Sequence, residues 1–483
     1  MKYQPIIGME VHAELSTNSK MFCGCSADFF GAEPNSHTCP TCLGLPGALP
    51  VINREAIKYT IKLGQALNCE IQAHSVFARK NYFYPDLPKG YQISQYELPL
   101  CLNGYADITP EGSDQPKRIR VRRAHLEEDT GKLTHLGQAS LVDLNRAGVP
   151  LLEIVTEADI TSAEEAYAYV SQLRQLVRYL GVGTGDMEKG AMRCEVNLSL
   201  TDPETGKWGT KVEIKNLNSF RSVRNAIAYE IERQAQVLDE GGTIEQVTMG
   251  WDENRQVTVL QRVKEGDTGY RYFPEPDLPP LDLDPVWIEE IRAELPELPE
   301  AKLARYTGPY GLTEKEAAVL VEDRAVAEYY DSVVAAAEGK AAVTPKLISN
   351  WLSGELFRLL SESGGDISQM KVAPAQLVAL IELVTANTIN QPAAKQTLGV
   401  MFETGRSPQE IVEALGLQQI SDEGQLVSVA QQVLADNPDA VAQFKNGKET
   451  IIKFLVGQVM RATRGKANPQ LAEQMLREQL SEA

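Results

Sequence analysis

The chain has 483 residues, 43% of them hydrophobic and 23% charged, and a formal net charge of −19. This length corresponds to about three domains with full hydrophobic cores. The negative charge argues against indiscriminate nucleic-acid binding, although a local basic patch would escape that argument. The sequence has no run of 18 apolar residues, so neither a transmembrane helix nor a membrane partner is expected. The N-terminal stretch lacks a signal-peptide core, which predicts a cytoplasmic protein.

The first predicted element is a strand over residues 7–15, where apolar and polar side chains alternate. This alternation places Glu10 and His12 together on the polar face of the strand. Further elements are predicted from periodicity and capping signals: strands over 116–126 and 149–155, and helices over 161–180 and 222–239. Strands interleaved with few helices indicate an α+β sheet domain over residues 1–295.

Four of the seven cysteines lie in the stretch MFCGCSADFFGAEPNSHTCPTC, at Cys23, Cys25, Cys39 and Cys42. Four thiolates can close a tetrahedral shell around zinc, and the glycine and proline residues around them suit such a loop. We therefore expect a structural Zn²⁺ site that staples the loop. His37 could replace one thiol, and the alternative interpretation is a set of free thiols without metal.

A proline-rich stretch over residues 273–299 predicts a domain boundary, because proline at that density blocks regular structure. A helical domain is predicted after it, over residues 296–405, with amphipathic helices over 314–336 and 344–360. Capping signals then predict a small α-helical tail domain over residues 406–483.

The tail contains a basic stretch, QFKNGKETIIKFLVGQVMRATRGK (443–466), with six Lys or Arg against one Glu. On so acidic a chain, this local excess of positive charge indicates a patch for a polyanion such as tRNA. The alternative is an ordinary solvated helix face, which composition alone slightly favours.

Several carboxylates and one imidazole occupy unusual positions. Glu10 and His12 share a strand face, the run HLEEDTG (125–131) adjoins a basic strand, and Glu153 interrupts an apolar strand. Carboxylates with an imidazole suit a hard cation such as Mg²⁺, and neighbouring Arg and Lys would hold phosphate oxygens. The sequence has no Walker phosphate loop. These residues indicate a phosphoryl-transfer site, and the alternative is that they form structural ion pairs.

Eight stretches occur in a fixed order along the chain: GMEVHAEL (8–15), CGCSADFFGAEPNSHTCPTCLGLPGALPV (23–51), ARKNYFYPDLPKGYQISQ (78–95), HLEEDTGK (125–132), DLNRAGVPLLEIVTE (143–157), MRCEVNLS (192–199), VEIKNLNSF (212–220) and GYRYFPEPDLPPL (269–281). Together they resemble the B-subunit family of bacterial-type aspartyl/glutamyl-tRNA amidotransferases. The resemblance implies a heterotrimer with a glutaminase A subunit and a small C subunit. It implies ATP- and Mg²⁺-dependent phosphorylation of the side-chain carboxylate of misacylated Glu-tRNA(Gln) or Asp-tRNA(Asn), then amidation by ammonia from glutamine. The implied catalytic domain is a sheet cradle similar to that of glutamine synthetase.

The resemblance also implies particular functional residues. The family's metal-binding pattern falls on His12, Glu128 and Glu153, with Glu10 beside them. A second set of residues is expected to bind nucleotide or acceptor: Arg193, Asn197 and Lys215. The alternative hypothesis is a non-catalytic, zinc-stabilised tRNA-binding scaffold of the same complex, with the active site wholly on the partners.

Overall fold

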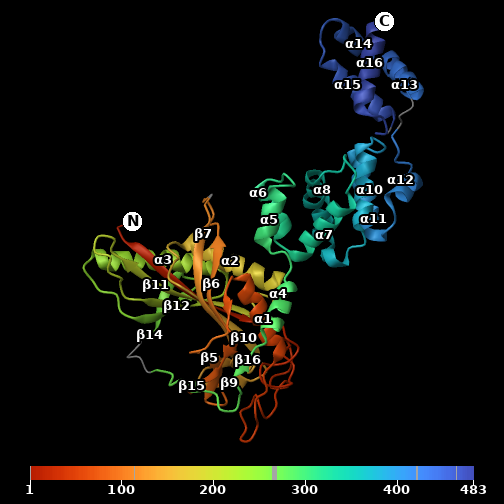
Figure 1. The fold of residues 1–483 in the computed structure, drawn as a ribbon. Coiled ribbons are helices and arrows are strands. Elements are labelled where there is room, and N and C mark those ends of the chain that lie inside the picture. Colours follow the sequence, from red (N-terminus) through yellow and green to blue (C-terminus); the bar gives the residue numbers. More distant parts are fainter. Residues whose placement is uncertain (1, 114, 264–268, 420–422, 464, 483) are drawn as a thin grey trace. The chain divides into compact units, whose positions relative to one another are not determined.

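The computed structural model describes residues 2–113, 115–263, 269–419, 423–463 and 465–482. The chain divides into two compact units, Met1–Pro299 and Glu300–Ala483 (Figure 1). The first unit contains a large mixed sheet and the second is helical, which confirms the α+β class. Within the described ranges, every helix is too short or too polar to cross a lipid bilayer.

A large sheet forms the body of the first unit. Its strands are β1 (Gln4–Glu14), β2 (Glu70–Ile71), β6 (Cys101–Ile108), β7 (Lys117–Glu128), β10 (Pro150–Thr156), β11 (Met192–Thr201), β12 (Val212–Leu217), β13 (Val247–Asp252) and β14 (Val257–Val263). They lie in the order β14-β13-β12-β11-β1-β10-β7-β6-β2. The β12–β13 pair is parallel, whereas β1 pairs with both of its neighbours in antiparallel register. The N-terminal strand is therefore central, and half of its side chains face each side of the sheet.

Three smaller sheets accompany the large one. Their strands are β3 (His74–Ser75) with β16 (Leu281–Asp282), β4 (Phe77–Asn81) between β5 (Tyr91–Gln95) and β15 (Phe273–Pro274), and β8 (Lys132–Leu136) with β9 (Ala139–Asp143). Two of these strands and helix α4 (Pro285–Ala293) fall in the proline-rich stretch, so the prediction that proline blocks regular structure there was wrong. Proline is tolerated because Pro274 lies in a two-residue edge strand and Pro285 occupies the first turn of α4.

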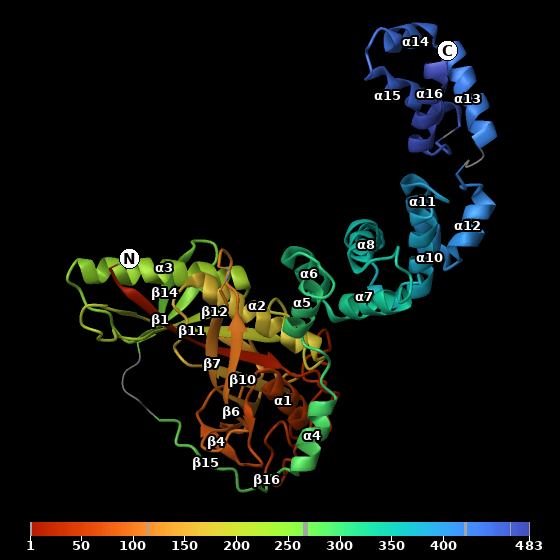
Figure 2. The same cartoon turned by 45° about the horizontal axis from the view of Figure 1, so that its top comes forward.

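Helices cover one face of the large sheet, as Figure 2 shows for α2 and α3. The helices are α1 (Arg54–Ala66), α2 (Ala163–Tyr179) and α3 (Phe220–Asp239). Ser162 and Ser219 cap the first turns of α2 and α3, each accepting a hydrogen bond from a backbone N–H three residues on. Buried side chains such as Val170 and Ile227 join Val11 of β1 in one continuous hydrophobic cluster. The opposite face of the sheet, which we call the polar face, carries the charged side chains.

A β-bulge interrupts the pairing of β7 with β10. Val155 lies opposite Arg123, but the next residue, Thr156, lies opposite Val121, so Arg122 is the extra residue. Before the bulge, odd-numbered residues of β7 such as Ile119 and Val121 are in the core, and after it even-numbered residues such as Ala124 and Leu126 are. The bulge therefore decides which acidic residues of β7 reach the polar face.

The second unit is built from helices. They are α5 (Pro299–Thr307), α6 (Glu314–Val321), α7 (Arg324–Ala336), α8 (Pro345–Trp351), a π-helix (Leu352–Leu356), α9 (Phe357–Ser363), a 3₁₀ turn (Ile367–Gln369), α10 (Pro374–Thr385), α11 (Gln391–Thr404), α12 (Pro408–Leu415), α13 (Glu423–Asp436), α14 (Pro438–Lys445), α15 (Ile451–Ala462) and α16 (Pro469–Glu482). The helix expected over 314–336 is two helices, because Asp323 caps a second start at α7. The helix expected over 344–360 is interrupted by the π-helix.

Two hydrophobic clusters hold the helices of the second unit. One includes Ile411 and Val412 of α12, and the other begins at Leu426 of α13. Residues 406–419, assigned from sequence to the tail domain, thus contribute to the core of the preceding helices. Tyr306 belongs to the cluster that includes Ile411. Its hydroxyl donates a hydrogen bond to Asp331, which also accepts hydrogen bonds from Lys302 and Arg305.

Candidate functional site

The candidate site lies on the polar face, where the central strand presents its charged residues. Met9, Val11 and Ala13 of β1 are buried in the core, which leaves Glu10, His12 and Glu14 on the other face. The antiparallel register places His12 beside Glu153 of β10 on one side and beside Arg193 of β11 on the other. The alternation seen in the sequence therefore produces the expected face.

Three residues form the His–Glu–Glu cluster: His12, Glu127 and Glu153. The Nε2 atom of His12 lies 3.5 Å from a carboxylate oxygen of Glu127 and 3.5 Å from one of Glu153. One ligand atom from each residue lies within 4.8 Å of the other two, a spacing that could hold a metal ion. Three adjacent strands supply the residues, so the sheet itself sets their spacing.

Burial and charge set the protonation of this cluster. Burial alone would lower the pKa of His12, but a hydrogen bond to Glu153 and the charge of Glu127 raise it to about 9. Burial and the nearby charge of Glu153 raise the pKa of Glu127. Although burial opposes it, His125 and His12 hold the pKa of Glu153 well below its usual range. Two buried carboxylates this close repel each other, and a bound cation would relieve that repulsion.

The structure does not bring Glu128 into the cluster. After the bulge, side chains of β7 alternate, so Glu127 faces His12 and Glu128 faces away. The Glu128 carboxylate instead pairs with the Lys89 ammonium and accepts a hydrogen bond from the Ile93 N–H at 2.9 Å. The expected convergence of His12, Glu128 and Glu153 is thus corrected to His12, Glu127 and Glu153.

Glu10 also lies on the polar face, but it is not one of the three clustered residues. It accepts a hydrogen bond from the Asn197 side-chain amide at 2.8 Å. Both residues line a cavity of about 220 Å³ that Trp208, Arg122 and Lys211 also line. Asn197, which was expected to bind nucleotide or acceptor, therefore lies beside Glu10. The cluster residue on the same strand, His12, lies two residues further along β1.

Arg193 and Lys215 lie on the same polar face, each paired with a carboxylate. Arg193 donates a hydrogen bond to Asp129 at 2.7 Å. Lys215 donates one to Glu195 at 2.8 Å, and the charges of Glu195 and Glu213 raise its pKa although burial opposes this. Cations are thus available on β11 and β12, on the opposite side of β1 from Glu127.

Lys80 of β4 is a cation beside the cluster that sequence reasoning did not single out. Burial would lower its pKa, but the negative charges of Glu127 and Glu153 raise it. Lys80 belongs to a different sheet from these carboxylates, and the sequence places it 47 residues before Glu127. Residue pattern alone gave no signal for this contact.

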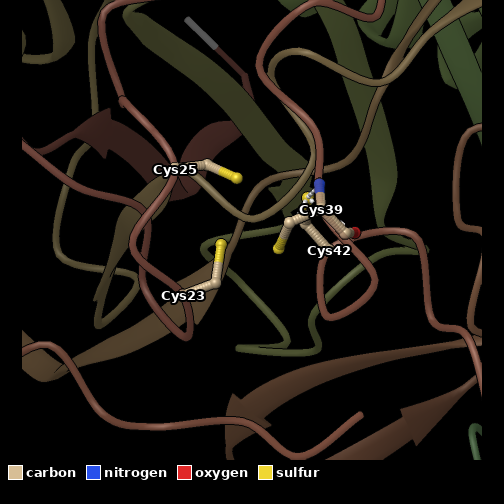
Figure 3. A group of neighbouring side chains, drawn as sticks. All are labelled: Cys23, Cys25, Cys39 and Cys42. Carbon is tan, nitrogen blue, oxygen red and sulfur yellow. Dashed lines mark hydrogen bonds between the residues drawn. The ribbon is translucent and has the colours of Figure 1, made fainter.

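The four cysteines of the expected zinc loop are close together, with their sulfur atoms directed toward one another (Figure 3). The four Sγ atoms lie within 4.8 Å of each other, and His37 is not part of this group. Hydrogen bonding to Cys23 lowers the pKa of the Cys42 thiol to about 4, while burial raises that of Cys25 to about 11. Four converging sulfur atoms fit a tetrahedral Zn²⁺ shell.

The basic stretch of the tail falls on α14, α15 and the segment after each. Lys445, Lys448, Lys453 and Arg461 are exposed, whereas Arg464 lies outside the described residues. The other side of α15 is buried in the hydrophobic cluster that begins at Leu426, through Ile452, Leu455 and Val459. This helix therefore has one core face and one basic face.

Comparison with known proteins agrees with this architecture. A family model described as the GatB/GatE catalytic domain matches residues 5–289, and one described as the GatB domain matches residues 328–480. The first match spans the sheet and its His–Glu–Glu cluster, and the second spans most of the helical unit. These matches define the class of the protein as a GatB/GatE-type catalytic domain followed by a GatB domain.

Full-length relatives narrow this class. The B subunit of the aspartyl/glutamyl-tRNA(Asn/Gln) amidotransferase of Thermomicrobium roseum is 52% identical, with 100% of this chain and 99% of the relative covered. The corresponding B subunits from Caldanaerobacter subterraneus and Carboxydothermus hydrogenoformans are 51% and 50% identical, with at least 99% of both chains covered. The chain belongs to the family of aspartyl/glutamyl-tRNA(Asn/Gln) amidotransferase B subunits.

Proposed function

We propose that this chain is the component of a tRNA-dependent amidotransferase that activates the side-chain carboxylate of misacylated Glu-tRNA(Gln), Asp-tRNA(Asn) or both. ATP is the proposed phosphoryl donor. The observation that carries the proposal is the His–Glu–Glu cluster on the polar face, with Lys80 and Arg193 on either side. Such a site brings cation-binding groups and positive side chains to one place, as phosphoryl transfer requires.

The donor set fits Mg²⁺. The carboxylates of Glu127 and Glu153 and the imidazole of His12 would hold the ion, and binding would displace the proton that the raised pKa of His12 retains. When bound, Mg²⁺ neutralises charge on the phosphates as the terminal phosphoryl group is transferred.

A carboxylate resists attack by ammonia because oxide is a poor leaving group, so the carboxylate must first be activated. One oxygen of the substrate carboxylate attacks the terminal phosphorus of ATP, ADP departs, and an acyl phosphate forms. Ammonia then attacks the acyl carbon, phosphate leaves with the C–O electron pair, and a proton from nitrogen passes to solvent. Lys80 offsets the charge of two anions brought together, and Arg193 and Lys215, each held by a carboxylate, are proposed to contact nucleotide or acceptor.

Partner subunits are proposed to supply the ammonia. We infer a complex in which a glutaminase A subunit releases the ammonia and a small C subunit completes a heterotrimer. Glu10 and Asn197 are proposed to contact nucleotide or acceptor, because they line the cavity next to the cluster. The basic face of α15 is proposed to bind the tRNA, and the cytoplasm is the inferred location.

The four-cysteine group is proposed as a structural zinc site. Its loop borders Glu128, since Cys23 and Cys42 line a cavity of about 200 Å³ together with Lys89 and Glu128. Zinc at this position would fix the loop that packs beside Glu128, without an open coordination position for catalysis.

A trapping experiment tests the proposed function. The reconstituted complex, supplied with ATP, Mg²⁺ and misacylated tRNA but no glutamine, should accumulate an activated carboxylate that hydroxylamine converts to a hydroxamate. Glu153→Gln should abolish the hydroxamate while leaving tRNA binding intact. Asp107→Asn, which removes the exposed ion pair between Asp107 of β6 and Arg118 of β7, is the matched control and should leave the yield unchanged. Full hydroxamate yield from Glu153→Gln would refute the site.

The same experiment addresses the scaffold alternative. If variants that replace any one of the three cluster residues bind tRNA and form as much hydroxamate as the wild-type complex does, the chain is a zinc-stabilised scaffold and the chemistry lies on a partner. Among the described residues, no observation favours that alternative, since a passive surface has no need for two buried carboxylates facing an imidazole.

A further inference from the structure

Four tyrosines crowd together on the surface beside the His–Glu–Glu cluster. This tyrosine patch consists of Tyr82, Tyr96, Tyr270 and Tyr272. The rings of Tyr96 and Tyr272 are stacked, with centroids 4.0 Å apart and planes 6° apart. Tyr270 makes edge contacts with Tyr272 at 6.2 Å and with Tyr82 at 5.8 Å. Two regions far apart in sequence, residues 82–96 and 270–272, supply these rings, so the fold itself assembles the patch.

The patch is more exposed than core packing would require. Tyr96 is 45% exposed and Tyr270 is 48% exposed, although each holds a fixed contact with another ring. Aromatic side chains whose only role is packing bury most of their surface, so a group of half-exposed rings indicates a surface that meets a partner.

Two cations adjoin the rings. The Lys80 ammonium lies 5.0 Å from the centre of the Tyr270 ring, and the Arg123 guanidinium carbon lies 5.8 Å from that of Tyr96. The Nε–H of Arg123 is buried, and it makes no hydrogen bond within the part of the chain that the structure describes. Flat rings next to two cations, on a chain of net charge −19, suit a nucleobase and its phosphate.

The patch also borders the proposed reaction site. Burial and the charges of Glu153 and Glu127 raise the pKa of Tyr272 to about 12, although Lys80 and Arg123 act in the opposite direction. Arg123 and Glu127 lie on the polar face of the same strand after the bulge, four residues or roughly 13 Å apart. That span is comparable to the length of an aminoacyl group joined to a nucleoside.

We propose that the tyrosine patch binds the 3′-terminal, single-stranded nucleotide of the acceptor tRNA. The terminal base extends the Tyr96–Tyr272 stack on the exposed side of Tyr96, while Lys80 and Arg123 face the phosphate. The aminoacyl group attached to that nucleotide then points along β7 toward the His–Glu–Glu cluster. This inference rests on the proposed function, because a tRNA-bound amino acid must be the substrate. Tyr96 and Tyr272 are binding residues here, and the chemistry stays with the cluster.

The test compares leucine and phenylalanine variants in the reconstituted complex. Tyr96→Leu and Tyr272→Leu remove the ring, whereas Tyr96→Phe and Tyr272→Phe keep it and serve as conservative rescues. Tyr105→Leu is the matched control, because Tyr105 of β6 makes a cation–π contact with Arg118 of β7, outside the patch. Equal thermal unfolding midpoints verify that each variant folds.

Two readouts are used. The first is KM for the misacylated tRNA, which the leucine variants should raise between about fivefold and a hundredfold with kcat nearly unchanged. The second is the fluorescence of a tRNA carrying 2-aminopurine as its 3′-terminal base, which stacking quenches. Wild type, the phenylalanine variants and Tyr105→Leu should quench it, and the leucine variants should not.

The outcomes separate this proposal from the proposed function. Unchanged KM and full quenching in both leucine variants, in a complex that still amidates, would overturn the stacking proposal alone. Loss of complex assembly in the leucine variants with quenching retained would show that a protein partner covers the patch, which also overturns it. A wild-type complex that quenches 2-aminopurine but forms no amide would instead refute the proposed function.

Discussion

Replacing Glu127 and Glu128 by glutamine, one at a time, separates two neighbours that the sequence alone does not distinguish. Glu127 faces His12 at 3.5 Å, whereas Glu128 pairs with Lys89 on the opposite face of β7. Glutamine keeps the size and a hydrogen-bond acceptor and removes only the charge. We expect Glu127→Gln to impair the chemistry and Glu128→Gln to impair stability.

The expected loss of stability in each variant depends on how deeply the replaced carboxylate is buried and paired. The side chains of Glu128 and Lys89 are 5% and 12% exposed, and breaking a buried ion pair costs about 3–5 kcal/mol. Glutamine can still accept the hydrogen bond from Ile93, so we expect the low end of that range and an unfolding temperature roughly 6 °C lower. Glu127 is instead a carboxylate whose pKa burial and Glu153 raise, so its neutralisation should change stability by less than about 1 kcal/mol.

For activity we expect the reverse order: Glu127→Gln should lose more activity than Glu128→Gln. Loss of an outer contact to a metal ligand typically costs roughly 10–100-fold, and loss of a direct ligand should cost at least as much. Thermal unfolding in a metal-free buffer measures the first effect, and hydroxamate formation at increasing Mg²⁺ measures the second. A Glu128→Gln variant that is fully stable but inactive, beside an active Glu127→Gln variant, would refute the reasoning from strand alternation.

Other predictions concern the zinc group, the tail and the second unit. Purified protein should contain about one zinc per chain, and Cys25→Ser should lower both the zinc content and the thermal midpoint; a metal-free wild type of equal stability would contradict this. Ending the chain after Gln419, which leaves Ile411 in its core, should weaken tRNA binding and spare activity at saturating tRNA. Lys453→Ala should reduce the slope of log affinity against log salt by about one, and an unchanged slope would mean a merely solvated face. Asp331→Asn should cost about 3 kcal/mol at neutral pH. Burial opposes it, but the cationic partners of Asp331 hold its pKa below 3.8, so this difference should fade as pH drops below that value.

Local patterns predicted much of the framework. The alternation around Glu10 and His12 identified the central strand and its polar face, because side-chain direction in a strand depends only on neighbouring residues. The helix starts at Ser162 and Ser219 lie close to the predicted ones, since capping is also local.

The remaining features depend on contacts between distant segments. The exchange of Glu128 for Glu127 follows from a bulge that is defined only by pairing with β10. Lys80 reaches the cluster from a separate sheet, and its field on Glu127 has no counterpart in local sequence. The break before α7 was missed although Asp323 is a good capping residue, because the apolar period continues across it.

The bulge at Arg122 lets β7 lose one residue there without changing which acid reaches the cluster. Val121 and Arg123 lie opposite the neighbouring residues Thr156 and Val155, so deleting Arg122 would join them into continuous pairing and leave every later side chain of β7 on its present side of the sheet. Deleting a residue between Arg123 and Glu127 would instead move the end of the strand by one position and place Glu128 opposite His12. A one-residue deletion should therefore be tolerated at the bulge and should abolish the chemistry beyond it.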